Sequence, residues 1–217
     1  MKKILLGLCA VVLLASACVK EKETPKGEAQ IRFLNAVVGA PAHDVYIADK
    51  KVISSGLSYG VISPYIKYTS GINLMAFVDP STNITSASEN YGSDIGDQAT
   101  LFLYANFQGR LTAGGIKDNM TAPAAGKARV RFINLHYNLT SAMIVSIQGG
   151  AQLFTELPFG SASAYFEVAP STKFTTQATG VTTNPVIDLN IQAGKIYNVW
   201  FSGANSTEIN GYGYTQN

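Results

Sequence analysis

Apolar and polar side chains alternate with a period of two in several short stretches of the chain. Ile31 and Phe33 alternate with Gln30 and Arg32, and residues 128–133 (ARVRFI) repeat this pattern. Successive side chains of a β-strand point to opposite faces, so each stretch would have one apolar face and one polar face. The pattern predicts a half-buried strand at both places.

Two alternating stretches near the C-terminus predict a β-hairpin. They are residues 187–191 (IDLNI) and 197–201 (YNVWF), with the sequence QAGK at 192–195 between them. A short Gly-containing loop between alternating stretches is typical of a hairpin. Elsewhere Val, Ile, Tyr and Phe occur in short runs among many Thr, Ser, Asn and Gly, and no stretch has the period of an amphipathic helix. This composition indicates an all-β protein.

The first half of the chain is repeated in the second half. Three pairs of segments correspond: AQIRFLNA (29–36) with ARVRFINL (128–135), DVYIADKKVISSGLSYGVISPY (44–65) with IVSIQGGAQLFTELPFGSASAY (144–165), and TLFLYANFQG (100–109) with IYNVWFSGAN (196–205). Units of about 90 residues are long enough to form a core of their own. We therefore expect two tandem antiparallel β-sandwiches of immunoglobulin-like or transthyretin-like type. Copy 1 would span 28–119 and copy 2 would span 127–217, joined by a Pro- and Gly-containing linker at 120–126.

The N-terminus has the three parts of a secretory signal peptide. Lys2 and Lys3 precede the apolar run 4–14, and the small residues 15–17 (ASA) precede Cys18. The apolar run is too short for a transmembrane helix, which needs about 20 residues. We expect a signal peptide at 1–17, cleaved between Ala17 and Cys18.

Cys18 is the expected site of lipid attachment. The segment resembles the bacterial lipobox, in which a cysteine that follows small residues is acylated, although Ala15 stands where Leu is usual. Cys9 lies in the signal peptide, so the mature chain has one thiol and no internal disulfide. Acyl chains on Cys18 would hold the protein firmly on a membrane. The alternative is an ordinary signal peptide in which Cys18 is incidental.

Residues 18–27 are expected to form a flexible tether. They are charged, lack aromatic residues and contain Pro25 and Gly27. The Lys–Glu run 20–23 resembles the export tags that carry lipoproteins outward in some Gram-negative bacteria, and a plain solvated spacer is the alternative. We expect an outer-membrane lipid anchor, with the protein on the cell surface or facing the periplasm.

The charge balance argues against nucleic acid as a partner. Without Lys2 and Lys3, the mature chain has 14 Lys+Arg and 14 Asp+Glu. A chain with no cationic surplus has nothing with which to neutralise a phosphate backbone.

The sequence resembles the domain-of-unknown-function family 4397. Copy 2 carries three landmarks of this family, KARVRFINL (127–135), LPFGSASAYFEVAPS (157–171) and IQAGKIYNVWFSG (191–203). Copy 1 keeps AQIRFLNAV (29–37) and LSYGVISPYIKYTSG (57–71) but has IGDQA (95–99) in place of the AGK turn. The resemblance implies a β-sandwich pair in an exported bacterial protein, and it implies no activity or catalytic residue.

Candidate catalytic and metal-binding residues are sparse. His43 and His136 lie at non-equivalent positions of the two copies, and the sequence has no HExxH or paired-cysteine spacing. His43 and Asp44 are neighbours, which places them on opposite faces of a strand. We expect His43 to be a loop residue without a catalytic role. No GxSxG motif occurs.

Carboxylate pairs offer no calcium loop of the DxDxDG kind. Asp94 and Asp97 are three residues apart, and Asp79 precedes Pro80, which predicts a turn. We expect no metal, no cofactor and no enzymatic activity.

Four aromatic residues are candidate ligand contacts. The repeat aligns Tyr104 with Trp200, and both lie on the strand face opposite Leu101 and Val199. Tyr212 and Tyr214 alternate on one face near the C-terminus. Such side chains stack on sugars or anchor a partner protein, and the alternative is that they pack under a strand or between the two copies.

Three functions remain open at this point. The first, which we favour, is a non-catalytic surface lipoprotein that binds a glycan, matrix component or partner protein. The second is a structural subunit of a surface assembly that pairs through edge strands. The third is a hydrolase with an unrecognised site.

Overall fold

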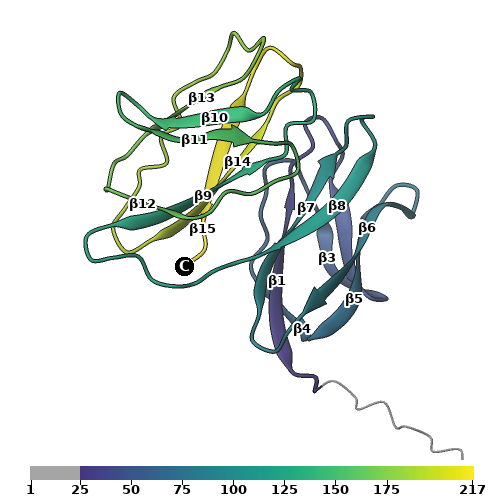
Figure 1. The fold of residues 1–217 in the computed structure, drawn as a ribbon. Coiled ribbons are helices and arrows are strands. Elements are labelled where there is room, and N and C mark those ends of the chain that lie inside the picture. Colours follow the sequence, from purple (N-terminus) through teal and green to yellow (C-terminus); the bar gives the residue numbers. More distant parts are fainter. Residues whose placement is uncertain (1–24) are drawn as a thin grey trace, which may run out of the picture.

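Residues 25–217 form two β-sandwiches, one for each copy. The computed structural model describes these residues as fifteen strands in four sheets (Figure 1). This confirms the all-β class. Within the described range no helix is long and apolar enough to cross a membrane.

Copy 1 consists of two four-stranded sheets. The first has the order β4 (Ile66–Thr69), β1 (Glu28–Asn35), β7 (Gln98–Ala105), β8 (Leu111–Lys117). The second has the order β3 (Lys50–Leu57), β2 (His43–Ile47), β5 (Gly71–Asp79), β6 (Ile84–Ser93).

Copy 2 repeats this arrangement with one strand fewer. Its first sheet has the order β12 (Phe166–Val168), β9 (Ala128–Asn134), β14 (Ile196–Ser202), β15 (Asn210–Thr215). Its second sheet has the order β11 (Gln152–Leu157), β10 (Met143–Ile147), β13 (Phe174–Gln177). The last strand of copy 1 ends at Lys117 and the first strand of copy 2 begins at Ala128, with no strand between them.

The centre of each first sheet is a parallel strand pair, so the prediction of purely antiparallel sheets is wrong in this respect. β1 pairs in parallel with β7, with Arg32 opposite Thr100. β9 pairs in parallel with β14, with Arg131 opposite Asn198. A period of two defines the two faces of a strand and carries no information about its direction, which depends on how the chain crosses between the sheets.

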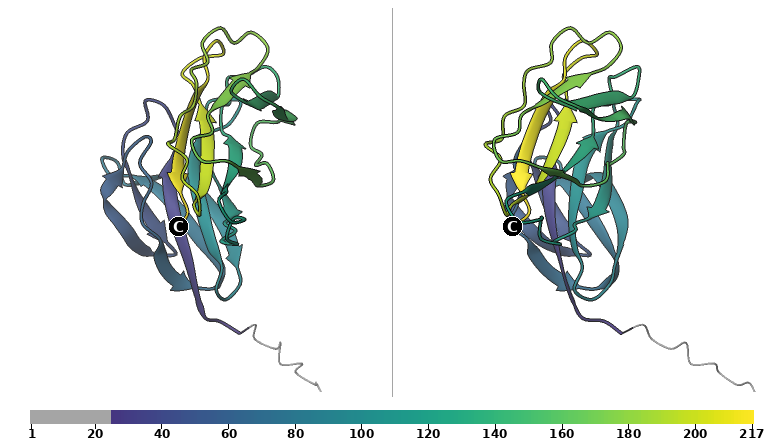
Figure 2. Two further views of the ribbon diagram at one scale, coloured as in Figure 1. Left: turned by 90° about the vertical axis from the view of Figure 1, so that its left-hand side faces the viewer. Right: turned by 60° about the vertical axis from the view of Figure 1, so that its left-hand side comes forward.

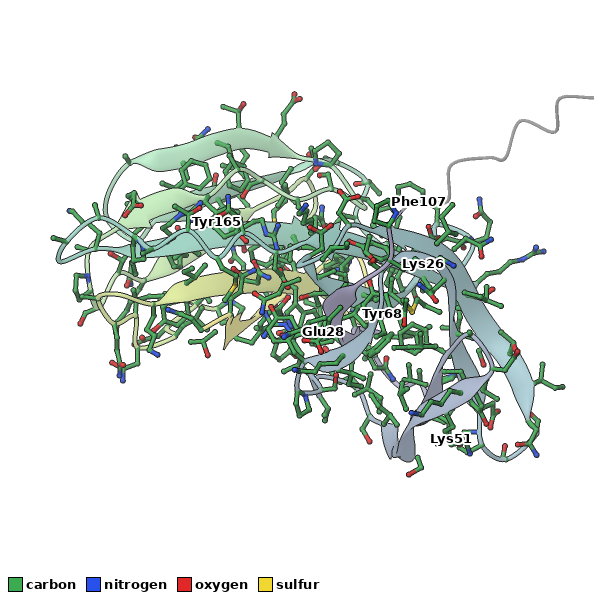
Figure 3. The ribbon with its side chains drawn as sticks, turned by 90° about the horizontal axis from the view of Figure 1, so that it is seen from below. Lys26, Glu28, Lys51, Tyr68, Phe107 and Tyr165 are labelled. Atoms are coloured by element: carbon green, nitrogen blue, oxygen red, sulfur yellow. The ribbon has the colours of Figure 1, made fainter. Side chains whose placement is uncertain are left out.

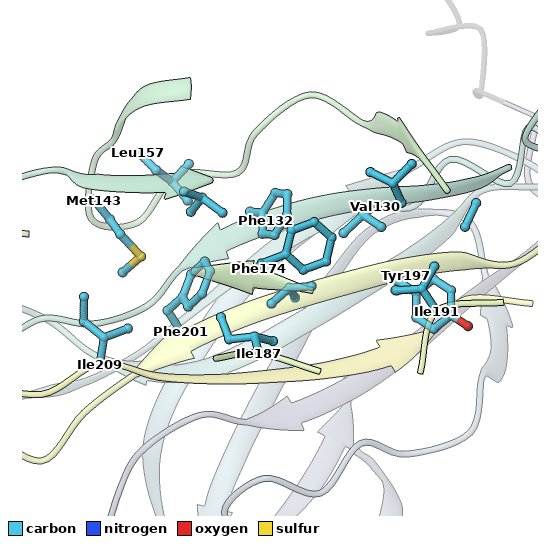
Figure 4. Packing of buried hydrophobic residues seen from close by; sticks show 14 of the residues in the cluster. Val130, Phe132, Met143, Leu157, Phe174, Ile187, Ile191, Tyr197, Phe201 and Ile209 are labelled. Carbon is cyan, nitrogen blue, oxygen red and sulfur yellow. The ribbon is translucent and has the colours of Figure 1, made fainter. Parts of the chain in front are cut away.

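Each sandwich has its own apolar core. Ile31 and Phe33 point into the core of copy 1, and Val130 and Phe132 point into the core of copy 2, as the alternation predicted. Figure 4 shows Phe132 among the aromatic and aliphatic side chains of copy 2. The strands are not half-buried, however, because the opposite face of β1 and β9 is covered as well.

The predicted hairpin of residues 187–191 and 197–201 does not form. β14 lies between β9 and β15, and residues 188–195 contain no strand. Ile187 instead forms an isolated bridge with Phe174 and packs over Gly211 of β15. Residues 187–191 cross over the sheet, which buries Ile187 and Ile191. A period of two cannot distinguish a segment that crosses over a sheet from a strand that pairs within it.

A buried asparagine ends the first strand of each copy. Asn134 is fully buried, and its side-chain Nδ2 donates to the Leu157 carbonyl at 2.9 Å while its Oδ1 accepts from the His136 amide at 3.0 Å. Asn35 forms the same two bonds in copy 1, with Leu57 and Val37. The asparagine therefore ties the strand end to the neighbouring loop, which explains its place in both repeats.

Replacing Asn134 with Ala should destabilise the protein. The Leu157 carbonyl and the His136 amide would each lose a buried partner, which costs about 1–3 kcal/mol per group. Urea denaturation measures the loss in the free energy of unfolding. Asn90, exposed on β6, provides the control, because Asn90→Ala should change that free energy by less than about 0.5 kcal/mol. Equal effects of the two substitutions would contradict this role of Asn134.

Candidate functional site at the seam between the copies

The first sheets of the two copies pack face to face, and this contact is called the seam below. Six buried apolar residues form its centre: Leu34, Ala36 and Phe102 from copy 1, and Ile133, Leu135 and Trp200 from copy 2. Figure 2 shows the yellow C-terminal strands of copy 2 beside the purple β1 of copy 1. The face predicted to be polar and solvent-exposed is therefore an interface.

Trp200 is buried in the seam, so it is not an exposed ligand contact. Its exposed fraction is 1%. The indole packs edge-on against Tyr59 of copy 1 at 5.9 Å between ring centroids and stacks on Tyr212 at 4.6 Å. The alternative interpretation, packing between the two copies, is the one that the structure supports. Because the whole ring of Trp200 packs against other side chains, no face of it is available to stack on a sugar.

The predicted equivalence of Tyr104 and Trp200 is also wrong. Trp200 lies opposite Ile133 in copy 2, and the residue opposite Leu34 in copy 1 is Phe102. Phe102 is thus the counterpart of Trp200. Two alignments that differ by two residues preserve the same alternation, so the sequence pattern cannot separate them.

Tyr104 belongs to a second aromatic cluster, which includes two residues that were not predicted. Its ring packs against Phe159 of copy 2 at 5.9 Å, and Phe159 packs against Phe107 at 4.5 Å. Phe107 is 63% exposed, whereas Tyr104 is half-buried. Tyr104, Phe107 and Phe159 are called the aromatic patch below. Their proximity requires the two copies to be docked, and no local pattern contains that information.

Tyr212 and Tyr214 share one face of β15, as predicted, but only Tyr212 is exposed, at 36%. The Tyr214 hydroxyl bonds the Asn198 side chain at 2.9 Å, and the Arg32 guanidinium lies 4.4 Å from the ring centre. Burial, and then the negative charge of Asp118, raise the pKa of Tyr214 to about 12. Tyr214 is therefore part of the seam.

Asp118 is the centre of a buried polar cluster at one end of the seam. One carboxylate oxygen accepts from Arg131 Nη2 at 2.7 Å and from Gln216 Nε2 at 2.6 Å. The other accepts from Thr100 Oγ1 at 2.7 Å and from the Tyr65 hydroxyl at 2.8 Å. The side chain of Asp118 is fully buried.

Arg32 completes this cluster from copy 1. Its Nη2 lies 3.8 Å from the Asp118 carboxylate, and its Nε donates to Thr100 Oγ1 at 3.1 Å. One buried carboxylate thus neutralises part of the charge of two buried guanidinium groups, Arg32 and Arg131. Arg32 Nη2 itself has no hydrogen-bond partner in the described part of the chain, so its contact with Asp118 is electrostatic. Buried charges of this kind are tolerated when they are paired and their other polar atoms are hydrogen-bonded.

The two copies contribute to the cluster reciprocally. Arg32 Nη1 donates to the Thr215 carbonyl of copy 2 at 3.0 Å, and Arg131 Nη1 donates to the Lys117 carbonyl of copy 1 at 2.8 Å. Each copy therefore contributes an equivalent arginine that bonds an equivalent backbone carbonyl of the other copy. This is the reciprocal pattern of contacts in a twofold-symmetric dimer.

Asp118 and Gln216 break this symmetry. Gln216 follows Thr215 as Asp118 follows Lys117, and the two side chains are hydrogen-bonded to each other. Two carboxylates at this separation would repel each other in a buried site. An amide opposite a carboxylate supplies a donor instead. Protein donors occupy both oxygens of Asp118, so the cluster has a structural role. Arg32, Thr100, Asp118, Arg131 and Gln216 are called the clasp below.

His43 and His136 are both buried, and His43 lies in a strand, so the prediction of a loop residue is wrong for His43. His43 begins β2, and its ring nitrogens lie 2.8 Å from the Pro41 carbonyl and 3.0 Å from Ser86 Oγ. His136 Nε2 donates to the Glu208 carbonyl at 2.7 Å, and burial lowers the pKa of this imidazole. His43 thus ties β2 to the preceding loop and to β6, whereas His136 joins the segment after β9 to the segment before β15.

The candidate carboxylates have structural partners. Asp79 accepts from the Ser81 amide at 2.8 Å, which confirms the predicted turn. Asp97 pairs with Lys117, and Asp44 pairs with Lys51 at 2.6 Å on the strand face opposite His43. No cluster of three or more His, Cys, Asp or Glu suited to a metal occurs within residues 25–217. Ala17 and Cys18 lie outside the described residues.

Replacing Asp118 with Asn should destabilise the protein strongly. The substitution keeps the shape of the side chain but leaves two buried guanidinium groups without a counter-charge, which costs about 3–5 kcal/mol. The free energy of unfolding in urea measures the effect. Asp79→Asn at the exposed turn is the matched control, for which we expect a change of less than about 1 kcal/mol. A loss at Asp118 no larger than that at Asp79 would contradict the role of the clasp.

Alkaline pH should weaken the seam through Tyr214. Above pH 10 an unfolded tyrosine releases its proton, whereas the folded chain retains the proton of Tyr214 up to a pKa of about 12. The unfolded state then binds fewer protons, so the free energy of unfolding falls as the pH rises through this window. Urea titrations at pH 8, 10 and 11 measure the slope. Tyr214→Phe should reduce it, and an unchanged slope would contradict the assignment.

The fold of copy 1 and the first strands of copy 2 match a known family. The family model described as Domain of unknown function (DUF4397) matches residues 29–144, which are more than half of the chain. The matched region contains Arg32, Asp118 and Arg131 and thus spans the centre of the clasp. No curated protein matches the chain. By this match, the chain belongs to the DUF4397 family.

Proposed function

We propose that the protein is a lipid-anchored, non-catalytic binding module that acts outside the cytoplasm. In this proposal Cys18 holds it on the outer membrane, and the aromatic patch contacts a glycan, a matrix component or a partner protein. The observation that carries the binding role is the exposure of Phe107, at 63%, in ring contact with Phe159.

The position of the aromatic patch supports this proposal. Phe107 lies in the loop after β7 of copy 1, whereas Phe159 lies in the loop after β11 of copy 2. Because the clasp and the apolar centre of the seam hold the copies together, the two rings are presented in one arrangement before any ligand arrives. A preorganised aromatic surface binds with a smaller entropic cost than one that must assemble.

A structural role through strand addition has less support. The second sheet of copy 2 lacks a counterpart of β6, so a partner strand would be expected to enter beside β13. The Phe174 amide of β13, however, donates to the Ile187 carbonyl at 3.0 Å, and the Ile187 amide donates to the Phe174 carbonyl at 2.9 Å. These bonds occupy the backbone groups of Phe174, and the Asn184 side chain donates to the Thr176 carbonyl, so part of this edge is already in use.

Replacing Cys18 with Ala should release the protein from membranes. Without its thiol the N-terminus has no acylation site, so the chain should move to the soluble fraction after cell lysis. Mass spectrometry of the native N-terminal peptide tests the acyl chains directly. An unmodified Cys18 in the native protein would overturn the anchor.

Replacing Phe107 with Ala should weaken ligand binding about tenfold, because losing one stacking contact costs on the order of 1.4 kcal/mol. The mature protein is tested on an immobilised array of bacterial and host glycans, and against surface proteins by cross-linking. Ile84→Ala is the control, since Ile84 is 65% exposed and lies on β6 of the second sheet, outside the aromatic patch. Equal binding by the wild-type protein and Phe107→Ala, at unchanged stability, would contradict the proposed contact.

A further inference from the structure

The end of copy 1 at which the described chain begins carries exposed apolar side chains. Ile72 at the start of β5 is 80% exposed, and Ile95 in the turn after β6 is 56% exposed. Leu74, two residues along the same face of β5, is 45% exposed. Exposed isoleucines at these fractions contribute nothing to the core and mark a surface that meets an apolar partner when they are grouped.

These side chains surround the entry of the chain into copy 1. Ile72 borders an open hollow of about 800 Å³ together with Pro25, Lys26 and Gly71. Ile95 packs directly on Gly27, where an added Cβ would lie 2.9 Å from its Cγ2 atom. Pro25, Lys26, Ile72 and Ile95 are called the tether end below.

The charges around the tether end are mixed. Lys67 pairs with Glu28 at 3.0 Å, and Lys117 pairs with Asp97. The Lys67 side chain is 68% exposed. Figure 3 looks onto this end of the molecule, with Lys26 and Glu28 labelled. At the boundary between lipid headgroups and acyl chains, apolar side chains contact the acyl chains. The long side chains of lysines beside them extend their charged ends toward water, so this combination of residues fits such a boundary.

We propose that the tether end rests on the lipid bilayer, with Ile72 and Ile95 entering the headgroup region. This inference depends on the proposed lipidation of Cys18. Only six residues separate Cys18 from Pro25. A chain spans at most about 3.6 Å per residue, so Pro25 lies within about 25 Å of the acylated cysteine whatever the conformation between them. The anchor thereby keeps the tether end at a high effective concentration beside the bilayer, so a weak apolar contact is sufficient.

This orientation would direct the aromatic patch away from the membrane. β7 begins with Gln98, next to Asp97 at the tether end, and Phe107 follows its opposite end. Strand residues rise about 3.3 Å each, so the eight residues of β7 place the two ends about 25 Å apart. Figure 1 likewise shows copy 2 on the side away from the N-terminal end of copy 1.

Membrane contact is tested by fluorescence quenching at single cysteines. Ile72→Cys, Ile95→Cys and Ile84→Cys are each labelled with bimane in the mature lipoprotein, reconstituted into phosphatidylcholine vesicles that contain a doxyl-labelled quencher lipid. Ile84 is a matched control, because it is 65% exposed and lies at the opposite end of the same strand pair, where it faces Asp79. We expect at least twofold stronger quenching at positions 72 and 95 than at position 84.

A second tether separates this inference from the proposed anchor. The same three labels are introduced into a chain that carries Cys18→Ser and an N-terminal hexahistidine tag, and this chain is bound to vesicles containing a nickel-chelating lipid. Stronger quenching at positions 72 and 95 would support the contact even if Cys18 were found unmodified. Equal quenching at all three positions, or the strongest quenching at position 84, would overturn the contact and leave the acylation of Cys18 as a separate result.

Discussion

The carboxylate of Asp118, held between two guanidinium groups, is the interaction on which the arrangement of the two copies depends. It lies in the segment that connects the copies and accepts hydrogen bonds from both of them, from Thr100 on one side and Arg131 on the other. A charge that is fully buried must keep its partners, because losing one leaves the other uncompensated in a medium of low dielectric constant. The clasp therefore specifies one relative placement of the two first sheets, and the apolar residues of the seam add cohesion to it.

Duplication of one unit explains both the symmetry of the seam and its single asymmetry. Arg32 and Arg131 occupy the same place in the repeat and reach the same backbone position of the opposite copy. Only Asp118 and Gln216 differ, since a symmetric pair of carboxylates would repel. A tandem chain permits this difference, whereas two identical chains related by a twofold axis would have the same residue at both positions.

The seam also decides which aromatic residues are available for binding. Trp200 and Tyr214 are used within it, while Phe107 and Phe159 meet at its margin with one ring exposed. The patch and the tether end lie beyond opposite ends of β7. A module with a membrane contact at one end and a preorganised aromatic surface at the other is a consistent physical basis for the proposed binding role.

The sequence by itself determined the all-β class, the two copies and the core-facing residues of β1 and β9, because alternation and repetition are local properties of a chain. It also predicted the turn at Asp79 and the shared face of Tyr212 and Tyr214. Only the tertiary structure decided that the outer faces of the first sheets are buried, that the central strands run parallel and that Phe102 is the counterpart of Trp200. Each of these depends on contacts between residues distant in the chain, and a period of two is compatible with either strand direction and with registers shifted by two residues.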